Sequence, residues 1–201
     1  MAMGNPEWVL AFEDEVWWSR FAYPGLHAWV DEDETMQLVE QKPKKDDPDP
    51  KALACYGLLT RTYGADGCKE KILLRFVDGR PVSDVTIQFL AWSCERLEEE
   101  GKKALLLIWD NASWHISRMV RNWIGEHNRQ VKESGKGVRI VSCPLPSRSP
   151  WLNPIEPMWI HGKRRVVEKD RTLSADELAE RVCSTFDCVH EKHLTVSKKV
   201  A

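Results

Sequence analysis

The sequence has no long hydrophobic run. Its longest purely apolar stretch, Ala104 to Trp109, is far too short to cross a bilayer, which takes about 20 apolar residues. The start, MAMGNPEWVL, carries neither a basic leader nor a long apolar stretch, so we expect no secretory signal. Because 42% of the 201 residues are hydrophobic, the chain can still build one substantial core. These features predict a single domain without a membrane partner.

Paired cysteines and glycine-rich loops are also missing. The six cysteines are scattered without a Cys-x-x-Cys pair, which predicts reduced thiols in a cytosolic protein rather than a disulfide framework. No glycine-rich phosphate-binding loop is present, which argues against a kinase. The sequence also contains no internal repeat and no recognisable helix-turn-helix segment.

The net charge is only −2, but its distribution along the chain is uneven. Residues 1–50 hold 12 acids and 4 Lys or Arg, whereas residues 101–171 hold 14 Lys or Arg and 6 acids. The acidic part fits an ordinary solvated surface, and the basic part is where a polyanion could dock. Charge alone does not decide between a plain surface and a nucleic-acid interface.

Apolar patterns and turn residues predict the order of the elements. Residues 31–51 are charged and contain proline, which predicts an exposed loop with room for a short strand. The pattern predicts a mixed sheet, antiparallel first and parallel later, flanked by helices, which is an α/β fold. Strands are expected at 8–18, 25–30, 52–60, 71–77, 104–109 and 137–143, and helices at 82–101, about 117–133, after Asn153, and at 174–186 with Ser174 as N-cap.

Asp110 directly follows the apolar run 104–109 and therefore lies at the carboxyl end of a central strand. Open α/β sheets bind their ligands at this edge. Alternatively, Asp110 or Asn111 caps the next helix or makes an Asx turn. Position alone leaves both interpretations open.

Asp14 lies within the first predicted strand, where alternation places it on the same face as Leu10 and Phe12. A carboxylate on such a face is costly to bury without a partner such as a metal ion. The alternative is a strand end that is already solvated. We expect Glu13 and Glu15 to be exposed neighbours, one of which could support the site.

Glu156 follows Asn153 by three residues, and Pro154 suits the first position of a helix. This spacing also fits a capping box, in which the glutamate bonds back to the backbone N–H of the cap residue. Pro157 weakens the first turn because it removes a backbone donor. The spacing leaves both interpretations open, but it predicts that the carboxylate is held in one direction.

Carboxylates from separate core elements can converge on Mg²⁺, which prefers oxygen ligands. Two such ions about 3.5–4 Å apart would stabilise the attacking and the leaving oxygen of a phosphodiester displacement. The basic run Lys163, Arg164 and Arg165 follows Glu156 within two turns and adds charge that can bind phosphate. A carboxylate cluster beside a cationic helix fits a nuclease.

The segments LLLIWDNASWH and LPSRSPWLNPIEPMW, with the earlier FEDE, resemble the catalytic domain of DDE transposases of the mariner superfamily, particularly its bacterial insertion-sequence branch. The family carries an aspartate on the first strand, an Asp-Asn segment ending in His after a later strand, and a Leu-Asn-Pro-x-Glu segment leading into a helix. The matches occur in the same order from Trp8 to about Glu168, and the last motif is highly specific.

The resemblance implies a ribonuclease H-like fold, two Mg²⁺ or Mn²⁺ ions, and DNA cleavage and strand transfer at transposon ends. In the family's scheme, water attacks first and the released 3′-hydroxyl then attacks target DNA. Motif matching implies that the catalytic metal ligands are Asp14, Asp110 and Glu156. It also implies supporting roles for Asn111, His115 and Asn153, although His115 could equally be a polar residue near a helix start.

The family's N-terminal helix-turn-helix region has no counterpart in this sequence. We therefore expect residues 1–201 to be one catalytic domain, and its partners to be double-stranded DNA, a second copy of the chain and a separately encoded helix-turn-helix protein. The implied location is the cytoplasm, at the nucleoid. The 45 residues between Asp110 and Glu156 exceed the usual interval, and Gly162 interrupts the expected helix.

Two weaker signals remain in the sequence. The stretch CSTFDCVHEKH gathers Cys183, Cys188 and two histidines, but its spacing matches no standard zinc site, so we expect the cysteines to pack in or beside the last helix. Most of the ten tryptophans are expected in the core or at sheet edges. Trp151 and Trp159 flank Glu156 and are the better candidates for contact with DNA, together with the basic run.

Two other functions stay open at this point. The chain could be a transposase-derived remnant that binds DNA or a partner without catalysis, or a structure-selective nuclease of the same fold. The three intact acids argue against the remnant, and the missing recognition region argues for it.

Overall fold

The computed structural model describes residues 4–21, 45–64, 67–147, 149–166, 168 and 171–197. The predicted strand 25–30 and most of the predicted loop 31–51 lie outside these ranges. The elements in chain order are β1 (Trp8–Ser19), β2 (Ala52–Gly64), β3 (Gly67–Asp78), α1 (Ser83–Glu99), β4 (Ala104–Trp109), α2 (Arg118–Ser134), β5 (Arg139–Pro144), the 3₁₀ turn η2 (Pro150–Leu152), α3 (Glu156–Val166), α4 (Ala175–Thr185) and β6 (Leu194–Thr195).

The described strands form one mixed sheet in the order β5-β4-β1-β2-β3-β6. Strands β1, β2 and β3 pair antiparallel, whereas β4 pairs parallel with β1 and β5 pairs parallel with β4. This arrangement confirms the predicted sheet, antiparallel first and parallel later. The short strand β6 lies parallel to β3 at the edge and was not predicted, because two residues carry no periodic signal.

Cap residues and apolar runs in the sequence predict the ends of most elements correctly. Ser117 caps α2 by accepting a hydrogen bond from the backbone N–H of Val120, and Ser174 forms a capping box with Glu177 at the start of α4. The predicted helix 82–101 corresponds to α1, and the predicted strand 104–109 corresponds to β4. Strand β2 continues to Gly64 and β3 begins at Gly67, so the hairpin that they form is longer than the predicted strands 52–60 and 71–77.

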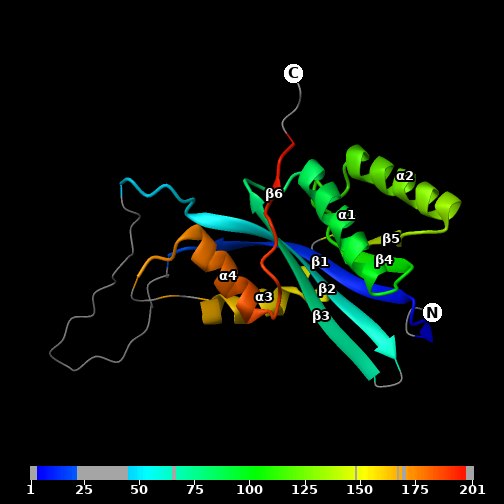
Figure 1. Cartoon of the computed structure of the whole chain (residues 1–201), viewed down its shortest axis with the longest axis horizontal. Coiled ribbons are helices and arrows are strands. Elements are labelled where there is room, and N and C mark those ends of the chain that lie inside the picture. The colour runs from blue at the N-terminus through cyan, green and yellow to red at the C-terminus, as the bar shows by residue number, and fades with distance from the viewer. Residues whose placement is uncertain are drawn as a thin grey trace.

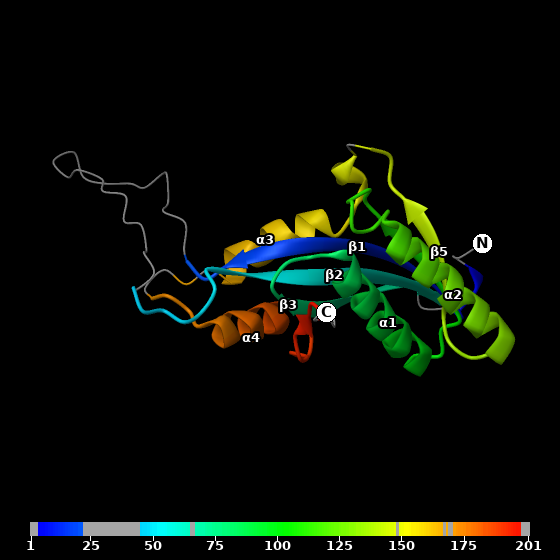
Figure 2. The same cartoon turned by 90° about the horizontal axis from the view of Figure 1, so that it is seen from above.

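The helices cover both faces of the sheet (Figure 1). Helices α1 and α2 pack on the face that carries Val9 and Ala11 of β1, and α3 and α4 pack on the face that carries Phe12. Figure 2 shows α3 running alongside β1, which is one of the central strands. Polar groups on β1 are therefore held between packed layers, where burial strengthens their interactions with one another.

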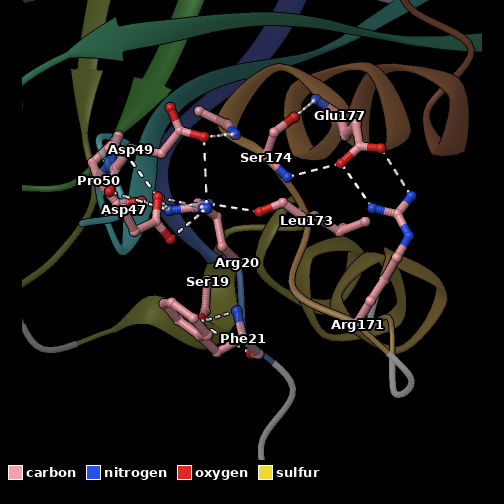
Figure 3. Close-up of polar contacts among 11 residues, drawn as sticks. Ser19, Arg20, Phe21, Asp47, Asp49, Pro50, Arg171, Leu173, Ser174 and Glu177 are labelled. Atoms are coloured by element: carbon pink, nitrogen blue, oxygen red, sulfur yellow. Dashed lines mark hydrogen bonds and ion pairs between the residues drawn. The ribbon is translucent and has the colours of Figure 1, made fainter. Parts of the chain in front are cut away.

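Buried Arg20, just after β1, ties three parts of the chain together (Figure 3). Its guanidinium donates to both carboxylate oxygens of Asp47, and its side chain is only 4% exposed. It also donates to the backbone carbonyls of Asp49, Pro50 and Leu173 at 2.7–3.2 Å. The end of β1, the segment before β2 and the segment before α4 are thereby fixed to one side chain.

The structure has neither a disulfide nor a membrane-spanning helix among the residues that it describes. All six cysteines lie within the described ranges, and all are free thiols, as predicted. Among the described helices, none combines the length and apolar character that a membrane span needs.

Candidate active site

Three acids from three separate elements line one cavity of about 390 Å³. Asp14 lies on β1, Asp110 directly follows β4, and Glu156 is the first residue of α3. The parallel register pairs Phe12 with Ile108, so two residues further along Asp14 and Asp110 point to the same face of adjacent strands. The rest of the lining consists of Asn111, Ala112, Leu145, Pro146, Ser147, Ser149 and Asn153.

Asp14 has a pKa that its surroundings raise. Burial, followed by the nearby negative charge of Glu156, raises the pKa of Asp14 to about 7, against the lowering effect of a hydrogen bond from Trp159. The Trp159 indole Nε1–H donates to Asp14 Oδ2 at 2.8 Å. Because the carboxyl groups of Asp14 and Glu156 repel each other when ionised, a cation between them would be strongly favoured.

The prediction that Trp159 contacts DNA is wrong. Its side chain is only 3% exposed and packs in the core between α3 and the sheet. Gly57, which pairs with Asp14 across β1 and β2, leaves room for the indole: a Cβ at Gly57 would lie 2.3 Å from Trp159 Cη2. The tryptophan that flanks Glu156 on the other side, Trp151, is 75% exposed.

Asp110 is held by two donors. Its Oδ1 accepts from the backbone N–H of Ala112 at 2.8 Å and lies 2.8 Å from His115 Nδ1. The hydrogen bond with His115 is the main reason why the pKa of Asp110 is lowered. The Asx turn that the sequence left as an alternative is therefore present, and the same carboxylate still lines the cavity.

His115 is buried and connects Asp110 to a second group of acids. Its ring stacks on Trp109 at 4.7 Å between centroids, and its Nε2 lies 3.0 Å from Glu15 Oε1 and 3.2 Å from Glu13 Oε2. Burial by itself lowers the pKa of His115, but the surrounding acids Glu13, Asp110 and Glu15 raise it to about 11. The imidazolium is thus the counterion of this group.

The expectation that Glu13 is exposed is wrong. Its side chain is fully buried, and among the described residues neither carboxylate oxygen has a hydrogen-bond partner beyond its contact with His115. Burial raises the pKa of Glu13 well above its ordinary value. The alternation of side chains along β1 indicates the burial of Glu13. Glu13 shares its strand face with Val9 and Ala11, which lie in the core under α1 and α2.

Glu156 is the first residue of α3, so the helix begins two residues later than Pro154. Asn153 is buried, and its side chain accepts from the N–H of Ile155 and donates to the backbone carbonyl of Glu13 at 3.0 Å. In the described structure the Glu156 carboxylate does not bond back to Asn153, so the capping box that the sequence left open as an alternative is not formed. Asn153 instead ties the loop to β1, and Glu156 lines the cavity.

Asn111 lines this cavity, and the basic run lies further along the helix that begins at Glu156. Asn111 Nδ2 donates to the carbonyl of Leu145 at 2.6 Å, which joins the ends of β4 and β5 at the cavity wall. Lys163, Arg164 and Arg165 are exposed on the last turns of α3. The helix carrying the third acid therefore presents a cationic surface to solvent.

Gly162 continues α3 rather than interrupting it. A Cβ there would lie 2.5 Å from Phe186 Cζ and 2.9 Å from Trp18 Cη2. The expectation of a better helix former at this position was wrong, because α3 approaches these two rings too closely for any side chain.

Two groups of side chains could hold a metal ion. Within the described ranges, Glu13, Glu15 and His115 are the set whose ligand atoms all lie within 4.8 Å of one another. Both nitrogens of His115 are already engaged with carboxylates, Nδ1 with Asp110 and Nε2 with Glu15, so the imidazole has no nitrogen left for an ion. The three acids around the cavity are more widely spaced and offer only oxygen, which is the ligand type of Mg²⁺ and Mn²⁺.

Solved structures of known proteins share this fold. The Mos1 transposase paired-end complex with left transposon end matches with a TM-score of 0.58 at 16% identity, over 89% of this chain and 47% of that one. The Mos1 mariner paired-end complex with Mn gives 0.57 at 15% identity, over 89% and 48%. A pre-cleavage Mos1 transpososome gives 0.56 at 13% identity, over 92% and 49%.

These likenesses confirm the predicted ribonuclease H-like fold, and the chain spans about half the length of the transposases it matches. No curated protein sequence shows significant similarity to the chain. The family model described as DDE superfamily endonuclease matches residues 27–179, about three quarters of the sequence. The chain is therefore a member of the DDE superfamily endonucleases.

Proposed function

We propose that this chain is the catalytic domain of a transposase, which cleaves DNA and transfers strands at transposon ends with two Mg²⁺ or Mn²⁺ ions. The observation that carries the proposal is the meeting of Asp14, Asp110 and Glu156 at one cavity, although 96 and 46 positions separate them along the chain. Membership of the endonuclease family supports the choice of DNA phosphodiester chemistry.

The residues around the cavity fit divalent ions. The donors are carboxylate oxygens, and the pKa of Asp14 is raised first by burial and then by the nearby charge of Glu156, which a cation would offset. Two ions about 3.5–4 Å apart would stabilise the attacking and leaving oxygens of the displaced phosphodiester, and such a pair needs ligands spread more widely than one ion does. We assign Asp14, Asp110 and Glu156 as the ligands.

Supporting residues orient each proposed ligand. The indole of Trp159 fixes Asp14, the imidazole of His115 fixes Asp110, and Asn153 anchors the loop that leads to Glu156. Rigid placement matters because a metal-dependent site loses activity when its outer hydrogen bonds are removed. Asn111 contributes by joining the two strand ends at the cavity wall.

The exposed basic run Lys163, Arg164 and Arg165 is proposed to bind DNA phosphates. It lies on the helix that begins at Glu156, so the bound backbone would pass close to the cavity. Of the two tryptophans that flank Glu156, exposed Trp151, in η2 beside the same cavity wall, remains the candidate for contact with bases.

We propose residues 1–201 as one catalytic domain that acts as a homodimer on DNA, at the bacterial nucleoid in the cytoplasm. One solved relative is a transposase complex with a transposon end, which supports double-stranded DNA as the partner. A separately encoded helix-turn-helix protein would supply recognition of the end sequence.

One assay tests the proposal. The chain is incubated with Mg²⁺ or Mn²⁺, a supercoiled plasmid, and a pre-cleaved DNA end taken from the sequence that flanks its reading frame. We expect covalent joining of the end to the plasmid. Asp110→Asn should abolish joining and nicking, whereas Glu133→Gln, which removes an exposed acid from α2, should retain both.

The same assay separates the alternatives. Nicking without joining would identify a nuclease of the same fold, and DNA binding without either reaction would identify an inactive remnant. If Asp110→Asn nicks as fast as the parent while circular dichroism shows both to be folded, Asp110 has no part in the reaction.

A further inference from the structure

The two histidines of the C-terminal segment lie together at the edge of the sheet, remote in sequence from the carboxylate site. His190 Nε2 and His193 Nε2 are 3.1 Å apart. His193 Nδ1 lies 2.7 Å from Asp78 Oδ1, at the end of β3. Both imidazole rings pack against the buried ring of Phe76, with centroids 5.8 and 5.5 Å away, which restricts their orientation.

The nearby cysteines take no part in this arrangement. Cys183 is a buried residue of α4, and the Cys188 thiol donates to the carbonyl of Ile72, which confirms that these cysteines pack in or beside the last helix. Burial raises the pKa of Cys183 to about 11 and that of Cys188 to about 12. Among the described residues, neither thiol forms a close set of ligand atoms with the histidines, so any site here depends on the histidines.

The spacing of the two nitrogens matches that of two ligands on one metal ion. Zinc–nitrogen bonds are about 2.0–2.1 Å, so two nitrogens bound to a tetrahedral ion lie roughly 3.3 Å apart, and about 2.9 Å apart at a right angle. The observed 3.1 Å lies between these values. A carboxylate that accepts the other ring N–H is the usual outer partner of a metal-binding histidine, and Asp78 occupies that position for His193.

A cavity beside the pair has room for further ligands. It has a volume of about 460 Å³, and its lining includes both histidines, Asp176 in the first turn of α4, and Glu191. A carboxylate or water there could complete the coordination of an ion. If Asp176 bound the same ion, the C-terminal segment would be fastened to α4.

We propose that His190 and His193 form a binding site for a divalent transition metal ion of the zinc class, with Asp78 as the outer partner of His193 and Asp176 or water completing the coordination. Imidazole nitrogen selects zinc, copper or nickel over Mg²⁺, so this site and the oxygen-only carboxylate site take different ions. The inference is independent of the proposed function, because it requires neither DNA nor catalysis.

Zinc titration of the metal-free chain tests this site. Zn²⁺ is added in the presence of excess Mg²⁺, which occupies oxygen sites, and binding is followed by competition with a chromophoric chelator. We expect the parent chain to bind one more Zn²⁺ than the His190→Ala/His193→Ala variant, and Zn²⁺ to raise the melting temperature of the parent alone. Asp78→Asn should weaken this binding about 10–100-fold.

His161→Ala is the matched control, because it removes an exposed imidazole from α3 and should leave zinc binding unchanged. If the double variant does not fold, His193→Gln gives the same comparison, since glutamine keeps a hydrogen-bonding group toward Asp78. Equal stoichiometry and affinity in the parent and a folded variant would show that the two rings merely share a hydrogen bond, and the proposal would be wrong.

Discussion

Trp159 of α3 donates its indole N–H to the carboxylate of Asp14 on β1, 145 residues away in sequence, at 2.8 Å. The side chain is buried against Gly57, the residue that pairs with Asp14 on β2. One contact therefore connects the helix carrying Glu156 to the strand carrying Asp14, and it sets the orientation of a proposed metal ligand.

Replacing Trp159 with Phe should weaken Mg²⁺ binding by about tenfold, because a hydrogen bond to a charged group contributes about 1.5–3 kcal/mol. Loss of this bond also removes one of the effects that lower the pKa of Asp14. The measurement is the Mg²⁺ concentration that gives half-maximal nicking. Trp123→Phe is the control, since Trp123 belongs to α2 and packs against the core on the opposite face of the sheet. Equal Mg²⁺ requirements in Trp159→Phe and the parent would contradict the positioning role.

Mg²⁺ binding should depend on pH around neutrality. The pKa of Asp14 is raised to about 7 from an ordinary 3.8, so this group stabilises the metal-free fold at low pH and that contribution is lost as the pH rises through 7. Mg²⁺ needs the ionised form and competes with the proton. We therefore expect Mg²⁺ to raise the melting temperature more at pH 8 than at pH 6. An equal or larger rise at pH 6 would contradict this, and Asp14→Asn should remove the difference.

The two helix glycines should respond in opposite directions to alanine. A methyl group at Gly125 in α2 would have none of the described atoms outside its own helix turn within 4 Å, so Gly125→Ala should stabilise the chain by about 0.5–1 kcal/mol. Gly162→Ala would press a methyl group into Phe186 and Trp18 and should destabilise it by about 1–3 kcal/mol. Urea unfolding of both variants measures the sign. A stabilised Gly162→Ala would mean that α3 lies further from these rings.

Arg20→Met should destabilise the fold by about 3–5 kcal/mol, because it removes a buried guanidinium that donates to the half-buried carboxylate of Asp47 and to three backbone carbonyls. The control is Lys103→Met, which removes an exposed ion pair with Glu7 and should cost less than about 1 kcal/mol. Denaturant unfolding compares the two variants. Similar losses in both would show that Arg20 contributes no more than a surface charge.

Neutralising Lys163, Arg164 and Arg165 together should weaken DNA binding and lower its salt dependence, by roughly 0.9 in slope for each phosphate that is no longer bound. The matched control neutralises Lys132, Lys136 and Arg139, which are exposed near the amino end of β5, away from the cavity. Binding to labelled duplex over a range of salt concentrations gives the slopes. If the control variant changes the slope and the α3 variant does not, the DNA lies on the other surface.

The sequence by itself determined the features that depend on neighbouring residues. Alternation placed Asp14 with Phe12 and Glu13 with Val9, the apolar run 104–109 placed Asp110 at a strand end, and Ser174 marked the start of α4. Each of these follows from backbone geometry within a few residues.

Only the tertiary structure decided which layer covers each face, and this changed the role of several residues. Trp159 is buried against Asp14 rather than available to DNA, Glu13 is enclosed with His115, and Gly162 is required by two aromatic rings. The contacts join segments distant in sequence, and their free energy comes from packing and desolvation between layers. A local pattern reports the face on which a side chain lies, but it does not report what will be packed against that face.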